Sequence, residues 1–228
     1  MKKMLVIILA LLVIVITCNE SFAEKSIFVN SIKFIQYLDE NTALEEVKNG
    51  NLDLYYYRIS PDRLESKQTT GELKIFDSTG GSYSLLVNPA DSEKFNPFSD
   101  KDARFALNYL VDRKLIVNEL MSGYGAQIIS YYGPTDPEYL TIIKELESFN
   151  FKYNPTLANK IISKSMTDRG AEKIDNEWKI DNEEIEISIF IRSDDPVRKS
   201  IGEILSVELE KIGFTVEKDY GDLNKAFV

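Results

Sequence analysis

The sequence predicts an α/β fold assembled from βαβ units. Apolar residues alternate along positions 185–191 as in a strand, and an apolar stripe at helical spacing follows from position 196. Gly213 can end that helix, and positions 214–217 then supply a second short strand. The chain has 228 residues, of which 43% are hydrophobic, so it can bury a core in one domain or in two small ones.

A first unit of the same kind is expected between residues 27 and 57. Positions 27–38 alternate as in a strand, Asp39 starts a short helix, and Gly50 ends it. Positions 51–57 form the next strand, which contains three consecutive tyrosines. These tyrosines can pack within the strand in the ordinary way, or they can present a stacking surface to a ligand.

Two glycines, Gly80 and Gly81, lie between strands expected at 73–76 and 83–87. Glycine tolerates positive φ angles and lets another backbone approach closely. The pair therefore predicts either a bulge or turn, or a segment whose bare backbone groups meet a ligand.

Two helices in series are expected between residues 88 and 125. Ser99 is placed as the N-cap of the first helix and Asp112 as that of the second, while Gly123 stands where a left-handed helix stop is expected. Each helix carries an apolar stripe. The stripe residues are Ala103, Ala106, Leu107, Leu110 and Val111 in the first helix and Leu115, Ile116, Leu120 and Met121 in the second.

The remaining elements follow from local signals. Asn154 and the proline after it begin a helix that ends near Gly170. A hairpin is expected over 174–180, and Trp178 within it is expected to cover an edge of the core. Asp195 and the following proline start the helix of the last unit.

Composition excludes several function classes. The chain contains no histidine and a single cysteine, Cys18, so no His-based catalysis, His-based zinc site or internal disulfide is expected. A net charge of −10 argues against nucleic-acid binding. Neither a P-loop nor an EF-hand motif occurs. We therefore expect a protein that is not an enzyme and that uses no cofactor and no metal.

The first 23 residues form a predicted signal peptide. Lys2 and Lys3 precede an apolar run over 4–16, which is shorter than a membrane-spanning helix requires, and cleavage is expected after Ala23. Lipid attachment at Cys18 and an uncleaved anchor are the two alternatives. Each option places the protein outside the cytoplasm, in the periplasm or at the outer face of the cell membrane.

The helix pair also resembles a known family. Its order of residues is similar to that of the solute-binding proteins of ABC importers in the family 5 group, which includes oligopeptide, dipeptide and nickel binders. The residues that carry the resemblance are Asn88, Pro97, Phe98, Asp100, Arg104, Ala106, Leu107, Tyr109, Asp112, Arg113, Gly123 and Gly125. Further similarities occur at Gly50 and Asp53 and in the phrase at 209–216.

The resemblance implies a periplasmic-binding-protein-like fold of the class II type, with βαβ units in two lobes. Residues 24–88 would form part of the first lobe, and residues 89–228 the second-lobe α/β domain, truncated at the C-terminus. Family members are two to three times longer, so the chain is expected to be incomplete relative to the family.

The resemblance also implies a function. The protein would bind peptides or a similar small solute and deliver them to the permease subunits of an ABC importer. In the family the strand after the glycine pair lines the cleft, and its backbone meets the peptide main chain. The candidate ligand-binding residues are Gly80, Gly81, Ser82, Tyr83, Tyr57 and Arg58. The alternative is an interaction or assembly module, or an inactive fragment, that kept the fold and lost the ligand pocket.

Overall fold

The computed structural model describes residues 29–60, 63, 73–76, 81–90, 94–133 and 136–227. Contacts divide the chain into two compact units, Met1–Leu52 and Asp53–Val228. The described part of the first unit holds one helix, α2 (Glu40–Lys48). The carboxylate of Asp39 accepts a hydrogen bond from the Thr42 N–H at 2.7 Å, and Gly50 has a φ of 74°. Both predicted ends of this helix are confirmed.

The strands predicted at 27–38, 51–57, 73–76 and 83–87 do not form among the described residues, which have no regular secondary structure there. A strand requires a neighbour that pairs with its N–H and C=O groups. The two sheets formed by the described residues include none of these segments, and Leu38 is 96% exposed. The expected βαβ unit within 24–88 is therefore wrong for these residues, whereas the lobe boundary at 88/89 stays a prediction.

Two helical segments in series follow, as predicted. A 3₁₀ turn, η1 (Pro97–Ser99), leads into α4 (Lys101–Leu110). The predicted N-cap, Ser99, is wrong by one residue because Ser99 belongs to the 3₁₀ turn. Asp100 caps α4 instead, and its carboxylate accepts a hydrogen bond from the Ala103 N–H at 2.9 Å.

The second segment comprises α5 (Arg113–Leu115) and a π-helical turn, η2 (Ile116–Leu120). The carboxylate of Asp112 accepts a hydrogen bond from the Leu115 N–H at 3.0 Å, and Gly123 has a φ of 80°. The predicted cap and the predicted stop are both confirmed. None of the residues of this segment is fully buried, so its expected apolar stripe is covered only in part.

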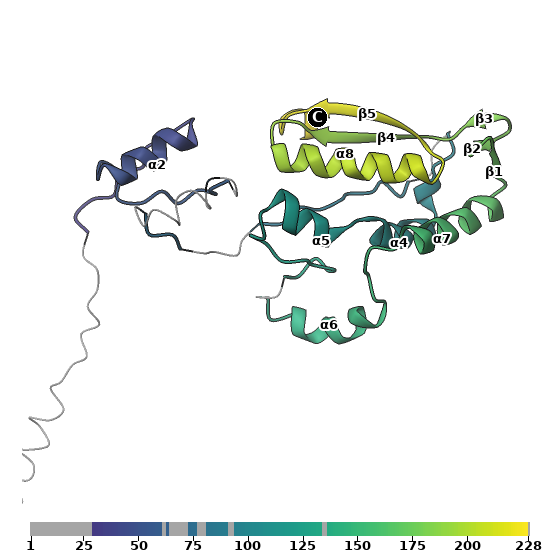
Figure 1. The fold of residues 1–228 in the computed structure, drawn as a ribbon, viewed down its shortest axis with the longest axis horizontal. Coiled ribbons are helices and arrows are strands. Elements are labelled where there is room, and N and C mark those ends of the chain that lie inside the picture. Colours follow the sequence, from purple (N-terminus) through teal and green to yellow (C-terminus); the bar gives the residue numbers. More distant parts are fainter. Residues whose placement is uncertain are drawn as a thin grey trace, which may run out of the picture. The chain divides into compact units, whose positions relative to one another are not determined.

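Helix α4 pairs with α7 (Pro155–Asp168), and the two lie side by side in Figure 1. The helix α6 (Tyr139–Ser148) between them in sequence has no buried residue. The amide of Asn154 caps α7, and Gly170, with a φ of 86°, follows its end, as predicted. On α4 the stripe residues Ala103, Ala106, Leu107 and Leu110 are buried.

A three-stranded antiparallel meander comes next. It consists of β1 (Glu172–Ile174), β2 (Glu177–Ile180) and β3 (Glu183–Glu184), in the order β1-β2-β3. Two-residue turns join the strands, and all four turn residues have positive φ, which is the geometry of type I′ hairpins. These residues are Asp175, Asn176, Asp181 and Asn182. The predicted hairpin is confirmed.

The last unit is a βαβ unit. Strand β4 (Glu186–Arg192) pairs in parallel with β5 (Thr215–Gly221), and α8 (Pro196–Lys211) connects them and lies along their sheet (Figure 1). Gly202 of α8 lies so close to the sheet that an added Cβ would be 2.8 Å from Ile191 Cγ1. The unit predicted for residues 185–217 is confirmed, and its second strand extends beyond the prediction.

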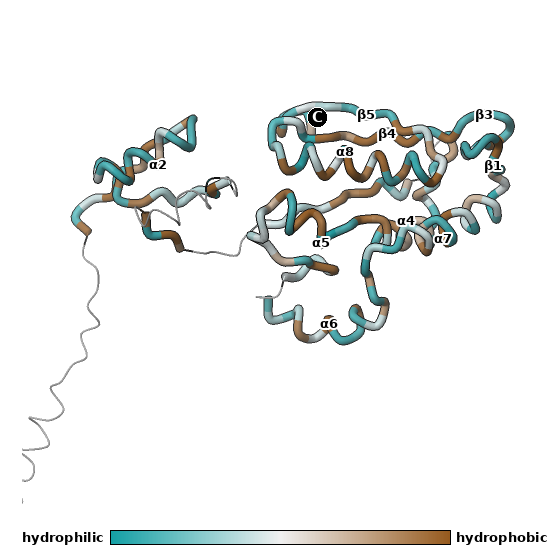
Figure 2. Tube along the Cα trace, viewed as in Figure 1, coloured by the Kyte–Doolittle hydropathy of each residue, from teal (hydrophilic) through white to brown (hydrophobic). Residues whose placement is uncertain are grey.

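One hydrophobic core joins α4, α7, the meander and the βαβ unit. Hydrophobic residues dominate β4 in Figure 2, whereas β5 is more polar. Trp178 is 3% exposed, and its indole N–H donates a hydrogen bond to the Ile212 carbonyl at 3.0 Å. The fully buried core residues include Leu110, Ile162, Met166 and Leu209. On α8 the core residues are Leu205 and Leu209, in the second half of the helix.

Within the described residues, no helix combines the length and the apolar character that crossing a bilayer requires. The predicted signal peptide lies outside the described residues.

Candidate functional site

The candidate site lies at the carboxyl ends of β4 and β5. Arg192 is paired with Gly221 at the last position of the parallel ladder, and the Ser193 N–H donates a hydrogen bond to the Gly221 carbonyl at 2.9 Å. In open parallel sheets, ligands bind in the crevice outside this edge. The loop from β4 to α8 and the loop after β5 therefore occupy the position where a site is expected.

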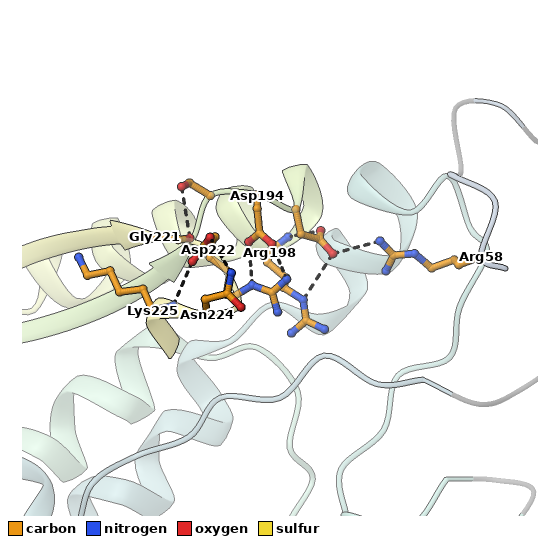
Figure 3. Close-up of polar contacts among 10 residues, drawn as sticks. Arg58, Asp194, Arg198, Gly221, Asp222, Asn224 and Lys225 are labelled. Atoms are coloured by element: carbon orange, nitrogen blue, oxygen red, sulfur yellow. Dashed lines mark hydrogen bonds and ion pairs between the residues drawn. The ribbon is translucent and has the colours of Figure 1, made fainter. Parts of the chain in front are cut away.

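Four residues beyond this edge form what we call the arginine–tyrosine cluster: Arg58, Tyr83, Asp195 and Arg198. Arg58 Nη2 donates a hydrogen bond to Asp195 Oδ2 at 3.0 Å, and its Nη1 donates to the Tyr83 hydroxyl. Arg198 Nε lies 3.4 Å from the same Asp195 oxygen. Figure 3 shows both guanidinium groups converging on this carboxylate. Residues that are 137 positions apart thus meet at one point.

The tyrosine ring lies within reach of both cations. The guanidinium carbons of Arg58 and Arg198 are 5.7 Å and 5.0 Å from the centroid of the Tyr83 ring. Such contacts are cation–π interactions, which hold a planar guanidinium against an aromatic face. Tyr83 therefore orients both arginines.

Asp195 organises the cluster and also starts α8. It is 8% exposed, and its Oδ1 accepts a hydrogen bond from the Arg198 N–H at 3.0 Å as the N-cap. Burial alone would raise the pKa of Asp195. Hydrogen bonds from the Arg198 N–H and from Arg58, together with the charges of both arginines, outweigh burial and hold the pKa below its ordinary value.

A second ion pair borders the cluster. Arg192 Nε and Nη2 donate to the two carboxylate oxygens of Asp194, both at 2.7 Å, in the bidentate geometry that guanidinium groups favour. These hydrogen bonds lower the pKa of Asp194. On the β5 side, the carboxylate of Asp222 accepts a hydrogen bond from the Lys225 N–H at 3.0 Å. Figure 3 shows these loop contacts next to the cluster.

Stability should depend on pH through Asp195. Because the folded state holds the pKa of Asp195 below its ordinary value of 3.8, its contribution is complete above that value. The contribution is lost as the pH falls through the folded-state pKa. We expect Asp195→Asn to lower the free energy of unfolding by about 1 kcal/mol at pH 6 and by progressively less below pH 3.8.

Urea denaturation of the wild type and of Asp195→Asn at a series of pH values measures the difference in their free energies of unfolding. Asp181→Asn is the matched control, because Asp181 is an exposed turn residue and its carboxylate accepts no hydrogen bond in the part of the chain that the structure describes. If the difference in free energy of unfolding between wild type and Asp195→Asn stays constant from pH 6 to pH 2, the assigned pKa shift is contradicted.

The structure brings together two of the six predicted ligand-binding residues. Arg58 and Tyr83 contact each other directly. Gly81 and Ser82 are exposed beside Tyr83, and Tyr57 is 73% exposed and forms no part of the cluster. Gly80 lies outside the described residues. Ligand binding by these residues stays a prediction.

Sequence reasoning missed Asp195 and Arg198. Asp195 was expected only as a helix start, and no local pattern distinguishes Arg198 from the other charged residues of its helix. Their association with Arg58 and Tyr83 is a long-range contact. One general rule could have indicated the loop after β4: ligands bind at the carboxyl ends of parallel strands.

A groove of about 510 Å³ between α4 and α7 is a second candidate. Several of its charged residues have partners: Asp100 caps α4 and accepts a hydrogen bond from Ser165 at 2.6 Å, and Lys164 pairs with Asp168. This groove shares no residue with the arginine–tyrosine cluster. Among the described residues, no group of three acidic, histidine or cysteine side chains could hold a metal ion.

Comparison with known proteins places the chain in a family. The family model of the bacterial extracellular solute-binding proteins, family 5 (middle region), matches residues 13–227. The chain belongs to this family. The match begins within the segment predicted as a signal peptide and ends in the helical turn after β5.

The relatives of this family 5 chain are binding proteins. The oligopeptide-binding protein AppA of Bacillus subtilis is 22% identical over 201 residues, which are 87% of this chain and 35% of AppA. The structure of NikZ from Campylobacter jejuni in complex with Ni(L-His) is similar with a TM-score of 0.57 and 25% identity, covering 81% of this chain and 35% of NikZ. AppA in complex with a nonapeptide gives a TM-score of 0.54, at 21% identity and 82% and 35% coverage.

These similarities confirm the periplasmic-binding-protein-like α/β fold. The chain spans about a third of the length of the relatives that it matches. The prediction that it is incomplete relative to the family is therefore confirmed.

Proposed function

We propose that this family 5 chain takes part in binding a peptide or a similar small solute outside the cytoplasm, for delivery to the permease subunits of an ABC importer. The family match over residues 13–227 carries the proposal. The position of Arg58 supports it, because Arg58 donates a hydrogen bond to Asp195 at the carboxyl end of β4, where ligands bind in parallel sheets, and Tyr83 contacts Arg58.

The proposed function is binding without catalysis. The chain has no histidine, and its only cysteine, Cys18, lies in the predicted signal peptide. The relatives are named as binding proteins rather than as enzymes. A predicted signal peptide and the extracellular family support a location in the periplasm or at the outer face of the membrane.

Solute binding can be tested by isothermal titration calorimetry. A pool of di- to pentapeptides is titrated into the chain without its first 23 residues, and a thermal shift is measured in parallel. We expect saturable heat and a rise in melting temperature, because a ligand that binds only the folded state stabilises it. If millimolar peptide produces no heat and no thermal shift, the proposal is overturned for this chain.

A second function is favoured by the exposed segments before residue 91. Large apolar side chains there are in solvent, with Leu38 96% and Leu86 91% exposed. Exposed apolar patches mark surfaces that contact other polypeptides. The chain would then be an interaction or assembly module. Light scattering separates the two functions: a stable dimer or larger assembly that binds no peptide would favour the module.

A further inference from the structure

We propose that helix α6 docks in the groove between α4 and α7 of a second copy of this chain. The apolar side of α6 that enters the groove consists of Tyr139, Ile142, Ile143 and Leu146, and we call it the α6 stripe. The α4–α7 groove is the groove of about 510 Å³ described above. The inference concerns association of the chain with itself, so it does not depend on the proposed solute binding.

The first argument is that α6 has an apolar side which the chain leaves uncovered. The stripe residues recur at positions i, i+3, i+4 and i+7, which lie on one side of a helix. None of the residues of α6 is buried, and none of them packs against the hydrophobic core formed by the described residues. Helix α6 lies apart from α4 and α7 in Figure 1. An amphipathic helix gains most of its stability by burying its apolar side, so α6 lacks a partner surface.

The second argument is that the α4–α7 groove fits a helix of this length. Its apolar lining consists of Phe105 from α4 and of Leu157 and Ile161 from α7, all of which are only partly buried. On α7 the lining runs from Leu157 to Arg169, a distance of roughly 18 Å at 1.5 Å per residue. The ten residues of α6 span roughly 15 Å. Amphipathic helices bind in apolar grooves of this kind.

The third argument is the charge on the two walls of the groove. The α7 wall carries Lys160 and the α4 wall carries Asp102. Within the described residues, neither of these side chains forms a hydrogen bond or an ion pair. With 3.6 residues per turn, Lys144 lies on one side of the α6 stripe and Glu145 on the other. When Glu145 faces α7 and Lys144 faces α4, unlike charges meet at both walls.

The occupant is a second copy because α6 is held away from the groove of its own chain. The segment that joins α6 to α7 is attached to α4 at both ends. The Tyr109 hydroxyl donates a hydrogen bond to the Phe149 carbonyl at 2.9 Å, and the Asn154 N–H donates to the Tyr109 carbonyl at 2.8 Å. The rings of Phe149 and Phe105 also meet edge to face, with centroids 5.4 Å apart. In a two-fold dimer each copy can place its α6 in the groove of the other, so the same contact forms twice.

Sedimentation velocity over a range of concentrations tests the association. The chain without its first 23 residues is measured at about 0.15 M salt, where the net negative charge of the chain is screened beyond about 8 Å. We expect a dimer that forms as the concentration rises. Ile143→Ser should raise its dissociation constant about hundredfold or more, because an apolar side chain is lost from both contacts. Circular dichroism should show this variant folded, since Ile143 is not part of the core.

A charge exchange tests which surfaces meet. Glu145→Lys and Lys160→Glu should each raise the dissociation constant about tenfold, because each variant places like charges together in both contacts. Mixed in equal amounts, the two variants should associate with each other within about threefold of the wild-type affinity. In the mixed dimer, each α6 meets a groove of opposite charge. Docking of α6 within its own chain cannot produce this recovery.

Glu183→Lys and Lys199→Glu are the matched controls. They make the same changes of charge at exposed positions that belong neither to α6 nor to the groove. Each should leave the dissociation constant within about twofold of the wild-type value. Leu86→Ser examines the other exposed apolar region, before residue 91.

Three results would overturn the proposed docking. The first is a chain that stays monomeric up to about 1 mM. The second is a mixture of Glu145→Lys and Lys160→Glu that associates no better than either variant alone. The third is a dimer that Leu86→Ser disrupts and Ile143→Ser does not, which would support the assembly module instead. Peptide binding is measured separately by calorimetry, so none of these results decides the solute-binding proposal.

Discussion

Replacing Trp178 with alanine should lower the free energy of unfolding by about 3–5 kcal/mol. The side chain is 3% exposed and belongs to the core that joins the meander to α8. Its loss would leave a cavity and would remove the hydrogen bond from the indole N–H to the Ile212 carbonyl, which is 3.0 Å long. Urea denaturation followed by far-UV circular dichroism measures the loss, because Trp178 is the only tryptophan and its fluorescence disappears with it.

Trp178→Phe provides the comparison for this prediction. Phenylalanine keeps an aromatic ring in the core but has no N–H donor. Trp178→Phe should therefore lower the free energy of unfolding clearly less than Trp178→Ala does. A loss below about 1 kcal/mol for Trp178→Ala would show that this residue is not part of the core, since buried aromatic residues cost more to remove.

Replacing Gly213 with alanine should lower the free energy of unfolding by about 3 kcal/mol or more, for two separate reasons. Gly213 has a φ of 101°, where residues with a Cβ are strained. An added Cβ would also lie 2.5 Å from the Asn176 carbonyl oxygen, which is part of the backbone of a tight turn. The carbonyl of Gly213 accepts a hydrogen bond from the Trp178 N–H at 2.8 Å, so neither partner can move aside without disturbing the other.

Gly170→Ala isolates the strain from the clash. Gly170 also follows a helix and has a φ of 86°, but an added Cβ there would meet nothing within 4 Å. This variant should therefore cost only about 1–2 kcal/mol. Both free energies come from urea denaturation. Equal losses for the two variants would contradict the close approach of Gly213 to the turn.

The second half of the fold was predictable from local signals. Helix caps such as Asn154, glycine stops such as Gly213 and the alternation of 185–191 depend on residues close in sequence, and each was confirmed. The predictions of strands before residue 90 were wrong because an alternation of apolar and polar residues indicates only that a segment can form a strand. Whether it does so depends on a pairing partner, which these segments lack in the described part of the chain.

The cluster shows the same division between local and long-range information. Arg58 and Tyr83 were candidates through the resemblance to the family, whereas Asp195 was expected only to start a helix. The contact between Arg58 and Asp195 spans 137 positions, and no sequence pattern encodes such a pair. All four residues of the cluster nevertheless belong to one compact unit, Asp53–Val228.

The type I′ turns at Asp175–Asn176 and Asp181–Asn182 bear on the order in which the chain folds. Each turn brings its strands together by closing a loop of two residues, which costs little chain entropy. Strands β4 and β5 can pair only after the whole of α8 has been placed between them. Contacts local in sequence form faster than distant ones. The meander is therefore expected to form before β4 and β5 pair, whereas Trp178 becomes buried only when the end of α8 packs against it.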